Sequence, residues 1–465
     1  MHIENNSTKR SRRAKRWIVL AAAVLVIAIL AVLLIPKLRV GAVEVIATPN
    51  YPEMAPYPQD ADYINEAGEF DSDGYMAAYD LWWASQELQQ NQPVGYTEGL
   101  DGYFRTTMQQ FLSGAGEQNV VYSPLNVYMA LAMLAETTDG DSRQQILDLL
   151  GAADMETLRA QASALWNANY SDDGMTTSHL ASSLWLNEEI AYRQDTLDQL
   201  AQTYYASSYQ GQMGSGAMDQ ALQSWINEQT GGLLEDAVEG VQLDAKTVLA
   251  LATTIYYRAA WADTFLSENT ASGTFCGAAG EQNCDFMHQS DSQNYYWGEK
   301  FSAVGKPLRE SGNMWFVLPD EGVSPEDLLQ DEETMQFMLS GGADWSNSSY
   351  VTVNLSVPKF DVSSDIQLQD GLKALGVTDV FDGAVSDFSP LCQDPAGIYL
   401  STAQHAARVA IDEEGCTATA FTLMAADRMS MPPEEEVDFT LDRPFLFLIT
   451  GQDGTILFAG VVNQV

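Results

Sequence analysis

An uninterrupted apolar segment near the N-terminus constrains the fold most strongly. Residues 17–35 (WIVLAAAVLVIAILAVLLI) are 19 uncharged and mostly apolar residues. As a helix rising ~1.5 Å per residue they would span roughly 28 Å, about the hydrocarbon thickness of a bilayer. Trp17 stands where an interfacial aromatic residue is expected. The segment therefore predicts a transmembrane helix.

The charges that flank this segment predict its orientation. Six basic residues lie between Lys9 and Arg16, so residues 1–16 are predicted to be a cytoplasmic tail, with the chain after residue 35 outside the cell. The alternative is a cleaved signal peptide, which would leave a secreted protein. The run is longer than a usual signal core and no clear cleavage site follows it, which favours a retained single-pass anchor in a cell membrane. Both alternatives export the bulk of the chain.

The overall composition excludes several classes of protein. The 465 residues include 22 Lys and Arg against 64 Asp and Glu, a formal charge of −42. Such an acidic surface repels phosphate, so nucleic acid is not expected as a partner. Hydrophobic residues make up 46% of the chain, which excludes disorder throughout. Four cysteines are too few for a disulfide scaffold.

Residues 36–96 are predicted to be an extracellular linker and N-terminal extension. Residues 41–60 contain four prolines and little periodicity, which is typical of a semi-extended spacer. Residues 61–95 are acidic and aromatic and include Trp82 and Trp83. They predict a short helix packed on the main domain.

Residues 97–465 are predicted to form one main domain of the α+β class. Helical periodicity dominates its first half, where Ser123 and Pro124 suit the N-cap and first turn of a buried helix over residues 127–138. Strand composition appears later, and GQDG at 451–454 predicts a hairpin turn. Helices followed by antiparallel strands indicate an α+β fold. The predicted strands are 182–187, 247–261, 313–319, 350–360, 445–451 and 455–463.

Enzyme motifs are absent from the sequence. Beyond the apolar segment there are three histidines, His179, His288 and His405, and no G-x-S-x-G, H-E-x-x-H, P-loop or G-x-G-x-x-G motif. We therefore expect no enzyme activity, no catalytic residue, no metal site and no cofactor. The many carboxylates are expected to be solvated surface.

The cysteines leave one question open. Cys276 and Cys284 flank a short Gly-containing loop, and an exported chain favours oxidation, so the sequence favours a disulfide between them over two free thiols. Cys392 and Cys416 are expected to be free.

Seven segments together resemble one family. The segment NVVYSPLNVYMALAMLAETTDGDSRQQI (119–146) resembles the second-helix block of the serpins, the serine protease inhibitors. HAARVAIDEEGCTATAFT (405–422) resembles the strand and hinge that lead into the serpin reactive loop. All seven occur in the family's order over about 370 residues. The other five are QSWINEQTGG (223–232), TTIYYRAAW (253–261), VPKFDV (357–362), LGVTDVFD with DFSPL (375–391) and DRPFLFLITGQDGTILFAGVVN (442–463).

The resemblance implies a fold and a mechanism. The fold would have three β-sheets, eight to nine helices and an exposed reactive loop near the C-terminus. The mechanism would be suicide inhibition, in which a target serine protease forms a covalent acyl-enzyme with the loop. The cleaved loop then inserts as a central strand and carries the protease away. At ~3.4 Å per residue, about 15 inserted residues would move it roughly 50 Å.

Insertion makes a chemical demand that the sequence meets. Alternate side chains of the inserted strand must enter a closed core, so they should be small and uncharged. The inward alternates would be Cys416, Ala418, Ala420 and Thr422, with Phe421 outward. The alternative is a non-inhibitory serpin that acts as a binding or chaperone module. The hinge runs over Glu413, Glu414, Gly415, Cys416, Thr417, Ala418, Thr419, Ala420, Phe421 and Thr422.

The resemblance also places the cleaved bond. Counting from Glu413 puts it at Met429–Ser430, which suits elastase-like or subtilisin-like proteases with medium apolar pockets. Shifted by one residue, Arg428–Met429 would suit trypsin-like proteases, whose pocket carries a carboxylate. The first assignment is preferred.

Five residues match positions that control sheet opening in the family. Ser123 and His405 match a hydrogen-bonded cluster under the opening sheet, and Trp261 matches the tryptophan beneath the point where the loop enters. Asn126 and Thr253 replace commoner residues there but can still form hydrogen bonds. The alternative is that all five are simply packed core.

Further partners are limited. Residues 152–175 carry only Arg159 as a basic residue, so activation by heparin-type polyanions is not expected. We expect a monomer whose partners are the target protease and, through the N-terminal helix, the membrane. The basic and apolar N-terminus favours a bacterial surface protein.

Overall fold

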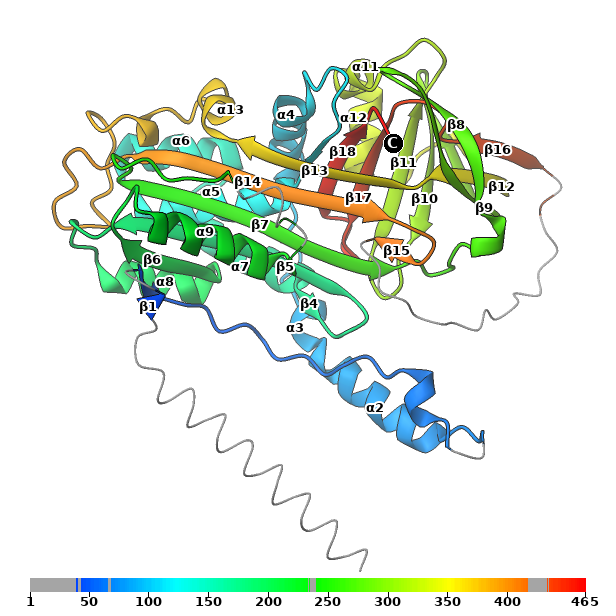
Figure 1. The fold of residues 1–465 in the computed structure, drawn as a ribbon, viewed down its shortest axis with the longest axis horizontal. Helices are drawn as coiled ribbons and strands as arrows, with labels where there is room; N and C mark the ends of the chain where they lie inside the picture. The colour runs from blue at the N-terminus through cyan, green and yellow to red at the C-terminus, as the bar shows by residue number, and fades with distance from the viewer. Residues whose placement is uncertain are drawn as a thin grey trace, which may run out of the picture.

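The computed structural model describes residues 39–40, 43–65, 68–232, 234, 240–416, 433 and 435–465 (Figure 1). Within these residues no helix has both the length and the apolar character needed to cross a bilayer. The predicted transmembrane segment 17–35 lies outside them.

Strands form two large sheets. Each has nine strands in the described part of the chain. The first sheet contains β1 (Arg39–Val40), β2 (Val43–Ala47), β4 (Ser171–Asp172), β5 (Thr177–Asn187), β6 (Ala206–Gly211), β7 (Leu249–Ala260), β13 (Phe360–Gln367), β14 (Leu400–Ile411) and β15 (Gly415–Cys416). The second contains β3 (Val120–Tyr122), β8 (Ala271–Gly277), β9 (Gly280–Trp297), β10 (Phe301–Pro307), β11 (Asn313–Pro319), β12 (Ser348–Pro358), β16 (Glu436–Thr440), β17 (Phe445–Thr450) and β18 (Ile456–Val462).

The expectation of three separate sheets needs correction. Strand β9 is 18 residues long and pairs in turn with β8, β12 and β10. It thereby joins two groups of strands into one hydrogen-bonded sheet. The predicted strands at 182–187, 247–261, 313–319, 350–360, 445–451 and 455–463 are confirmed within β5, β7, β11, β12, β17 and β18.

Helices cover the sheets. Nine α-helices lie in the described part of residues 97–465, in agreement with the eight to nine expected there, and two more lie in the N-terminal extension. In the described chain three further helical segments of four to six residues accompany the eight that have nine or more. The longer ones are α2 (Ser72–Ser85), α4 (Leu100–Leu112), α5 (Pro124–Thr137), α6 (Gly140–Leu150), α7 (Met155–Asn169), α8 (Gln194–Thr203), α9 (Gly216–Gln229) and α12 (Glu332–Ser340). The short ones are α3 (Glu87–Gln90), α11 (Pro325–Leu329) and α13 (Gln369–Ala374), with 3-10 turns η1 (Asp60–Tyr63), η2 (Ser267–Asn269) and η3 (Asp379–Phe381).

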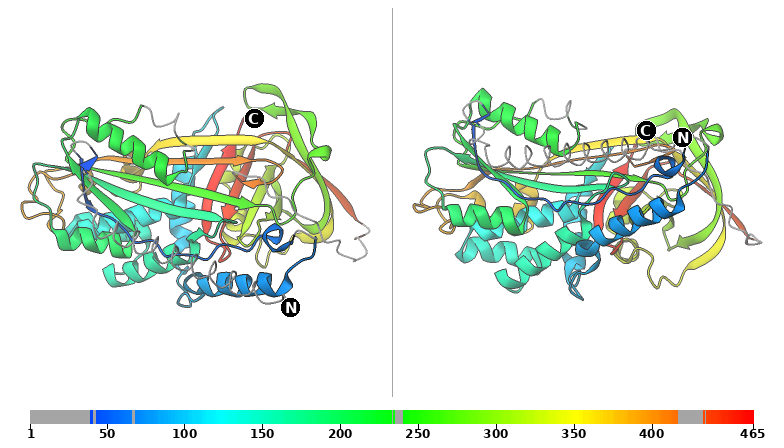
Figure 2. Two further views of the ribbon diagram at one scale, coloured as in Figure 1. Left: turned by 60° about the horizontal axis from the view of Figure 1, so that its bottom comes forward. Right: turned by 90° about the horizontal axis from the view of Figure 1, so that it is seen from below.

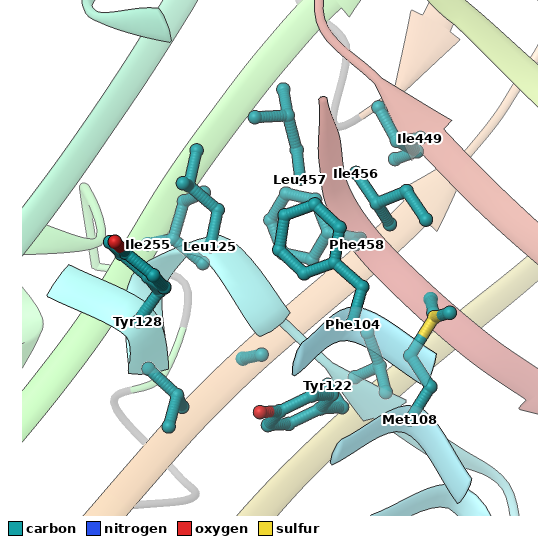
Figure 3. Close-up of a cluster of buried hydrophobic side chains, with 14 of the residues drawn as sticks. Phe104, Met108, Tyr122, Leu125, Tyr128, Ile255, Ile449, Ile456, Leu457 and Phe458 are labelled. Atoms are coloured by element: carbon teal, nitrogen blue, oxygen red, sulfur yellow. The ribbon is translucent and has the colours of Figure 1, made fainter. Parts of the chain in front are cut away.

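Helix α5 lies at the centre of the core. Every residue of it is buried, as its apolar composition predicts. Ser123 caps it by accepting a hydrogen bond from the Asn126 amide N–H, and Pro124 starts the first turn. Figure 3 shows Leu125 and Tyr128 of α5 beside Ile255 of β7 and Phe458 of β18. The α+β class is confirmed.

The N-terminal extension is packed on the domain more closely than a spacer would be. Strand β2 pairs with β6 at the edge of the first sheet, so the expected spacer at 41–60 is partly a strand. The helix predicted within 61–95 is α2, and its Trp82 is buried with the indole N–H donating to Asp173 Oδ2 at 2.8 Å. Glu44 of β2 lies opposite Gln210 of β6, which lies beside Leu186 of β5. Leu186 is opposite Leu249, the first residue of β7, so β2 lies at the end of the sheet where β7 begins.

Candidate functional site

The first sheet has a seam between β7 and β14. These two strands run parallel and pair from Leu400 and Leu249 to Ala406 and Thr254. Towards the other end, β15 lies between them and is antiparallel to both, with Cys416 opposite Ala259 on one side and Ile411 on the other. Figure 1 shows β15 at the end of the sheet away from β1. The seam has thus taken in the first two residues of an added central strand.

Gly415 and Cys416 fit this position for steric reasons. A Cβ on Gly415 would lie 2.2 Å from the carbonyl oxygen of Ala259, so only glycine fits. Cys416 is 1% exposed, and its Sγ lies 3.7 Å from Sδ of Met314. Burial, followed by the nearby Asp412, raises the pKa of the Cys416 thiol far above its usual range. The thiol is therefore neutral and inward-facing.

The backbone before β15 is fixed by Trp261. Its indole N–H donates to the carbonyl of Asp412 and its amide N–H donates to the carbonyl of Glu414, both at 2.9 Å. Asp412 folds the chain into a turn by accepting from the amides of Glu414 at 2.8 Å and Gly415 at 3.2 Å. Trp261 is fully buried and thus holds the hinge at the point where β15 enters the sheet.

The Glu413 carboxylate fastens the hinge to Lys359, between β12 and β13, and to Thr270, just before β8. Its Oε1 lies 2.8 Å from Nζ of Lys359 and accepts a hydrogen bond of 2.7 Å from the Thr270 hydroxyl. Burial alone would raise the pKa of Glu413, but the hydrogen bonds from Lys359 and Thr270 outweigh it and lower that pKa. The carboxylate is therefore ionised and paired while the hinge is docked.

Lys306 is a buried cation beneath the hinge. Its ammonium lies 5.5 Å from the ring centre of Trp261 and 4.3 Å from that of Phe265. It donates to the Asp263 carbonyl at 2.9 Å and to Oε1 of Gln289. Burial lowers the pKa of Lys306 to about 8, against the opposing effect of Asp291 and Asp263. The Lys306 ammonium lies over both rings and therefore stabilises the position of Trp261.

Ser123 and His405 meet under the middle of the seam. The Ser123 amide N–H donates to Nε2 of His405 at 3.1 Å, and both residues are fully buried. Burial lowers the pKa of His405 to about 3. The imidazole is therefore neutral, with its proton on Nδ1, which has no hydrogen-bond partner among the described residues.

The other two predicted control residues lie beside this pair. Thr253 is opposite His405 in the β7–β14 ladder, and its hydroxyl donates to the Ala181 carbonyl at 3.3 Å. Asn126 is fully buried, but its side-chain oxygen and nitrogen have no partner among the described residues. The hydrogen-bonding capacity of the Asn126 side chain is therefore not used among the described residues. Four of the five residues cluster at the seam, whereas Trp261 lies at the hinge.

The predicted disulfide between Cys276 and Cys284 is wrong for this structure. Both are free thiols, as are Cys392 and Cys416. In the β8–β9 hairpin Cys276 lies opposite Glu281 and Cys284 lies opposite Gly273. A three-residue offset along antiparallel strands separates the two thiols and turns them to opposite faces.

The remaining predicted positions fall outside the described residues. These are the hinge residues Thr417, Ala418, Thr419, Ala420, Phe421 and Thr422, and the bond at Met429–Ser430 or its alternative Arg428–Met429.

Four site residues were not predicted from the sequence: Thr270, Lys306, Lys359 and Asp412. One signal could have drawn attention to the lysines. Only 14 basic residues follow residue 40, so each basic side chain on a strand is uncommon in this chain. Their partners lie far away in sequence, which no local pattern encodes.

A family model for the serpins, the serine protease inhibitors, matches residues 104–465. This chain belongs to the serpin family. Among curated serpins it is 28% identical over 366 residues to wheat Serpin-Z2B, covering 74% of this chain and 90% of the relative. It is 29% identical to mouse neuroserpin, covering 76% and 88%. It is 27% identical to human leukocyte elastase inhibitor, covering 74% and 92%.

Solved structures agree on the serpin fold. The native state of the thermophilic serpin tengpin superimposes with a TM-score of 0.72 at 22% identity, covering 81% of this chain and 96% of that one. Human thyroxine-binding globulin gives a TM-score of 0.68 at 21% identity, covering 79% and 98%. Serpins are protease inhibitors as a family, although a thyroxine-binding member shares the fold.

Proposed function

We propose that this serpin is a suicide-substrate inhibitor of serine proteases. The observation that carries the proposal is the position of β15. It lies antiparallel between two parallel strands, with Gly415 and Cys416 already seated in the sheet. Loop insertion requires a new strand that runs antiparallel to both β7 and β14, and β15 already runs in this direction between them.

The chemistry follows from attack on the loop. The protease serine oxygen forms an ester bond with the Met429 carbonyl carbon, the Met429–Ser430 peptide bond breaks, and the serine proton passes to the new amino group of Ser430. The loop that leads to Met429 then continues the path of β15 and carries the acylated protease along the sheet. Deformation of the protease stops water from releasing the ester.

The sheet itself supplies a driving force. Parallel pairing is slightly less stable per residue than antiparallel pairing. A full inserted strand would replace the parallel β7–β14 ladder with two antiparallel ladders, extending the two that β15 already forms. The closed sheet is therefore the less stable arrangement once the loop is cut.

The proposed targets are elastase-like or subtilisin-like proteases, because Met429 precedes the assigned bond. A relative named leukocyte elastase inhibitor supports this class. Arg428 gives trypsin-like proteases as the alternative.

We further propose that residues 17–35 anchor the protein in a bacterial cell membrane. At most about 25 Å of extended chain, residues 36–42, separates this segment from β2. Strand β2 begins at the end of the first sheet opposite to the hinge, so the hinge strand β15 would lie on the side away from the membrane (Figure 1). Secretion after signal cleavage is the alternative, and analysis of the mature N-terminus in membrane and medium fractions distinguishes them.

The test of inhibition uses the full chain in detergent micelles with pancreatic elastase, subtilisin and trypsin in separate reactions. We expect an SDS-stable complex and a released fragment that begins at Ser430. A fragment beginning at Met429 would assign trypsin-like targets.

A matched pair of variants tests insertion. Ala418→Glu places a charge on the inward phase and should turn the inhibitor into a substrate, with complex yield reduced at least about tenfold because a buried unpaired charge is costly. Thr419→Glu, on the outward phase, should leave the yield near that of the unchanged chain. Clean cleavage of the unchanged chain without complex by all three proteases would support a non-inhibitory serpin.

A further inference from the structure

Helix α2 presents an outer face that the body of the serpin leaves uncovered. This outer face consists of Asp73, Met76, Asp80 and Trp83 of α2, continued by Glu87 of α3. Residues 73, 76, 80, 83 and 87 recur at steps of three and four, so they form one stripe along the helical axis. The helix precedes residue 104, where the match to the serpin family begins.

The two apolar side chains of the outer face are unusually open to solvent. Met76 and Trp83 are each 52% exposed. Leu81 is 68% exposed on another side of α2, where it borders the pocket lined by Tyr57 and Asp173. Ile64 and Phe70, which form a bridge just before the helix, are 52% and 48% exposed. Such grouping of large apolar side chains on a soluble surface marks an interaction site.

The opposite side of α2 fixes this face in place. Trp82 is 3% exposed, donates to Asp173, and lies edge-on to Tyr57 with ring centres 5.0 Å apart. The Ser85 hydroxyl oxygen accepts from the Ala55 amide at 3.1 Å. These contacts fix which side of α2 faces the body, and the outer face is therefore held towards solvent.

Hydrogen bonds connect this docking to the hinge. Asp173 and Gly174 lie in the turn between β4 and β5, and Arg258 of β7 donates to the Gly174 carbonyl at 3.2 Å. The next residues of β7, Ala259 and Ala260, pair with Cys416 and Gly415. Figures 1 and 2 show α2 on the same half of the molecule as β15 and β16, the two strands that flank the reactive loop.

The charge of this region selects the kind of partner. Residues 57–90 contain eight acidic residues and no lysine or arginine. An anionic lipid surface would repel them, and a second copy of the same face would bring like charges together. A protein surface with an apolar centre and a basic rim would be complementary to the outer face of α2 in both hydrophobicity and charge.

We propose that the α2 outer face is an exosite for the target protease. It would contact the protease beside its active-site cleft while the reactive loop occupies that cleft. This inference rests on the proposed inhibitory function. The apolar side chains would add buried contact area, and the carboxylates would speed encounter with a basic protease.

The experiment measures the second-order rate constant of complex formation by the full chain with each protease that it traps. We expect Met76→Ser and Trp83→Ser combined to lower this constant about tenfold or more for the preferred basic protease. Val385→Ser, which changes a residue of 58% exposure in the stretch between η3 and β14, is the matched control and should change the constant less than twofold.

A second set of variants tests charge. Asp73→Asn, Asp80→Asn and Glu87→Gln combined should lower the rate constant and flatten its dependence on ionic strength. Glu188→Gln, Glu189→Gln and Asp195→Asn remove equal charge near the C-terminal end of β5, opposite to the hinge, and should preserve most of that dependence.

The outcomes separate the exosite from inhibition itself. If the unchanged chain traps no protease, the inhibitory function fails. If it traps proteases and both α2 variants react with each of them at the unchanged rate, the exosite is overturned while inhibition stands. Folding of the variants is checked by an unchanged ratio of complex to cleaved serpin, since the substituted side chains leave the Trp82 and Ser85 contacts of α2 in place. A dimer that the double serine variant dissociates would reassign the face to a second copy.

Discussion

Two seams between neighbouring strands differ in strand direction and in how fully their buried polar groups are paired. The β17–β18 seam of the second sheet is antiparallel: Phe445 lies opposite Val462 at one end, and Thr450 lies opposite Ile456 at the other. Every residue of both strands is buried. The β7–β14 seam of the first sheet is parallel over part of its length and holds β15 over another part. Buried polar atoms of Asn126 and His405 near it have no partner in the described chain.

The difference teaches where this fold stores free energy. Unpaired buried polar groups and parallel pairing both reduce the stability of the closed first sheet. The apolar β17–β18 seam has neither disadvantage and provides a scaffold against which the first sheet can rearrange. Changes to the two seams should therefore differ in kind.

The largest effect is expected from the fixed seam. Phe447 is fully buried, packs with its ring centre 5.4 Å from that of Phe360, and covers Gly460. Phe447→Ala should cost about 3–5 kcal/mol in the free energy of unfolding through cavity formation. Denaturant unfolding should show this loss both before and after cleavage of the loop, and Phe447→Leu should lose less. A loss confined to the uncleaved form would contradict the fixed role of this seam.

A smaller effect is expected where the hinge is fastened. Lys359→Ala leaves the Glu413 carboxylate partly buried without its cation, which should cost about 1–2 kcal/mol. Cys416 should then react faster with a thiol reagent, because its burial depends on the docked hinge. Arg408→Ala removes a more exposed pair with Asp361 and should cost less than about 1 kcal/mol. Equal thiol reactivity in the two variants would argue against fastening by Glu413.

The pH dependence of the movable seam has a defined sign. The pKa of His405 is lowered by burial to about 3, so the unfolded chain binds a proton there that the closed fold does not. The stability of the closed sheet should therefore fall as pH decreases from about 6.5 towards 3, and this contribution is fully present above 6.5. NMR titration of the imidazole should show no protonation above pH 4. Titration near pH 6.5 would mean that the seam is open to water.

The smallest effect on stability is expected at Gly415. Gly415→Ala places a Cβ against the Ala259 carbonyl and should expel β15, which has only two residues. The thermal midpoint should change by only a few degrees, while Cys416 becomes reactive to thiol reagents. Gly216→Ala, at a glycine whose Cβ position is open and whose φ is not left-handed, is the control for loss of a glycine alone. A thiol that stays protected in Gly415→Ala would show that the hinge tolerates a side chain.

The sequence predicted elements that local signals encode. The Ser123 cap, the buried α5 and the GQDG turn are examples, because each depends on neighbouring residues. Strand β2 was missed since its five residues lie within a proline-rich stretch. The long β9 lacks an apolar alternation, so its joining of two strand groups was not visible.

The site was predictable in outline through the family motifs, but not in its contacts. The pairing of Glu413 with Lys359 and the stacking of Lys306 on Trp261 join segments far apart in sequence. The offset of Cys276 and Cys284 is set by the register of a hairpin, which spacing alone did not determine. Sequence analysis missed these contacts because the chain topology, and not the neighbouring sequence, brings the partners together.

The central claim is that the β7–β14 seam accepts the cut loop as an added strand. The most direct test is the thermal unfolding midpoint of the full chain before and after a single cleavage within residues 417–430. Insertion predicts a rise of more than about 10 °C, because several kcal/mol of new pairing and burial are added to the sheet. An unchanged or lower midpoint after cleavage would contradict insertion and with it the proposed inhibitory mechanism.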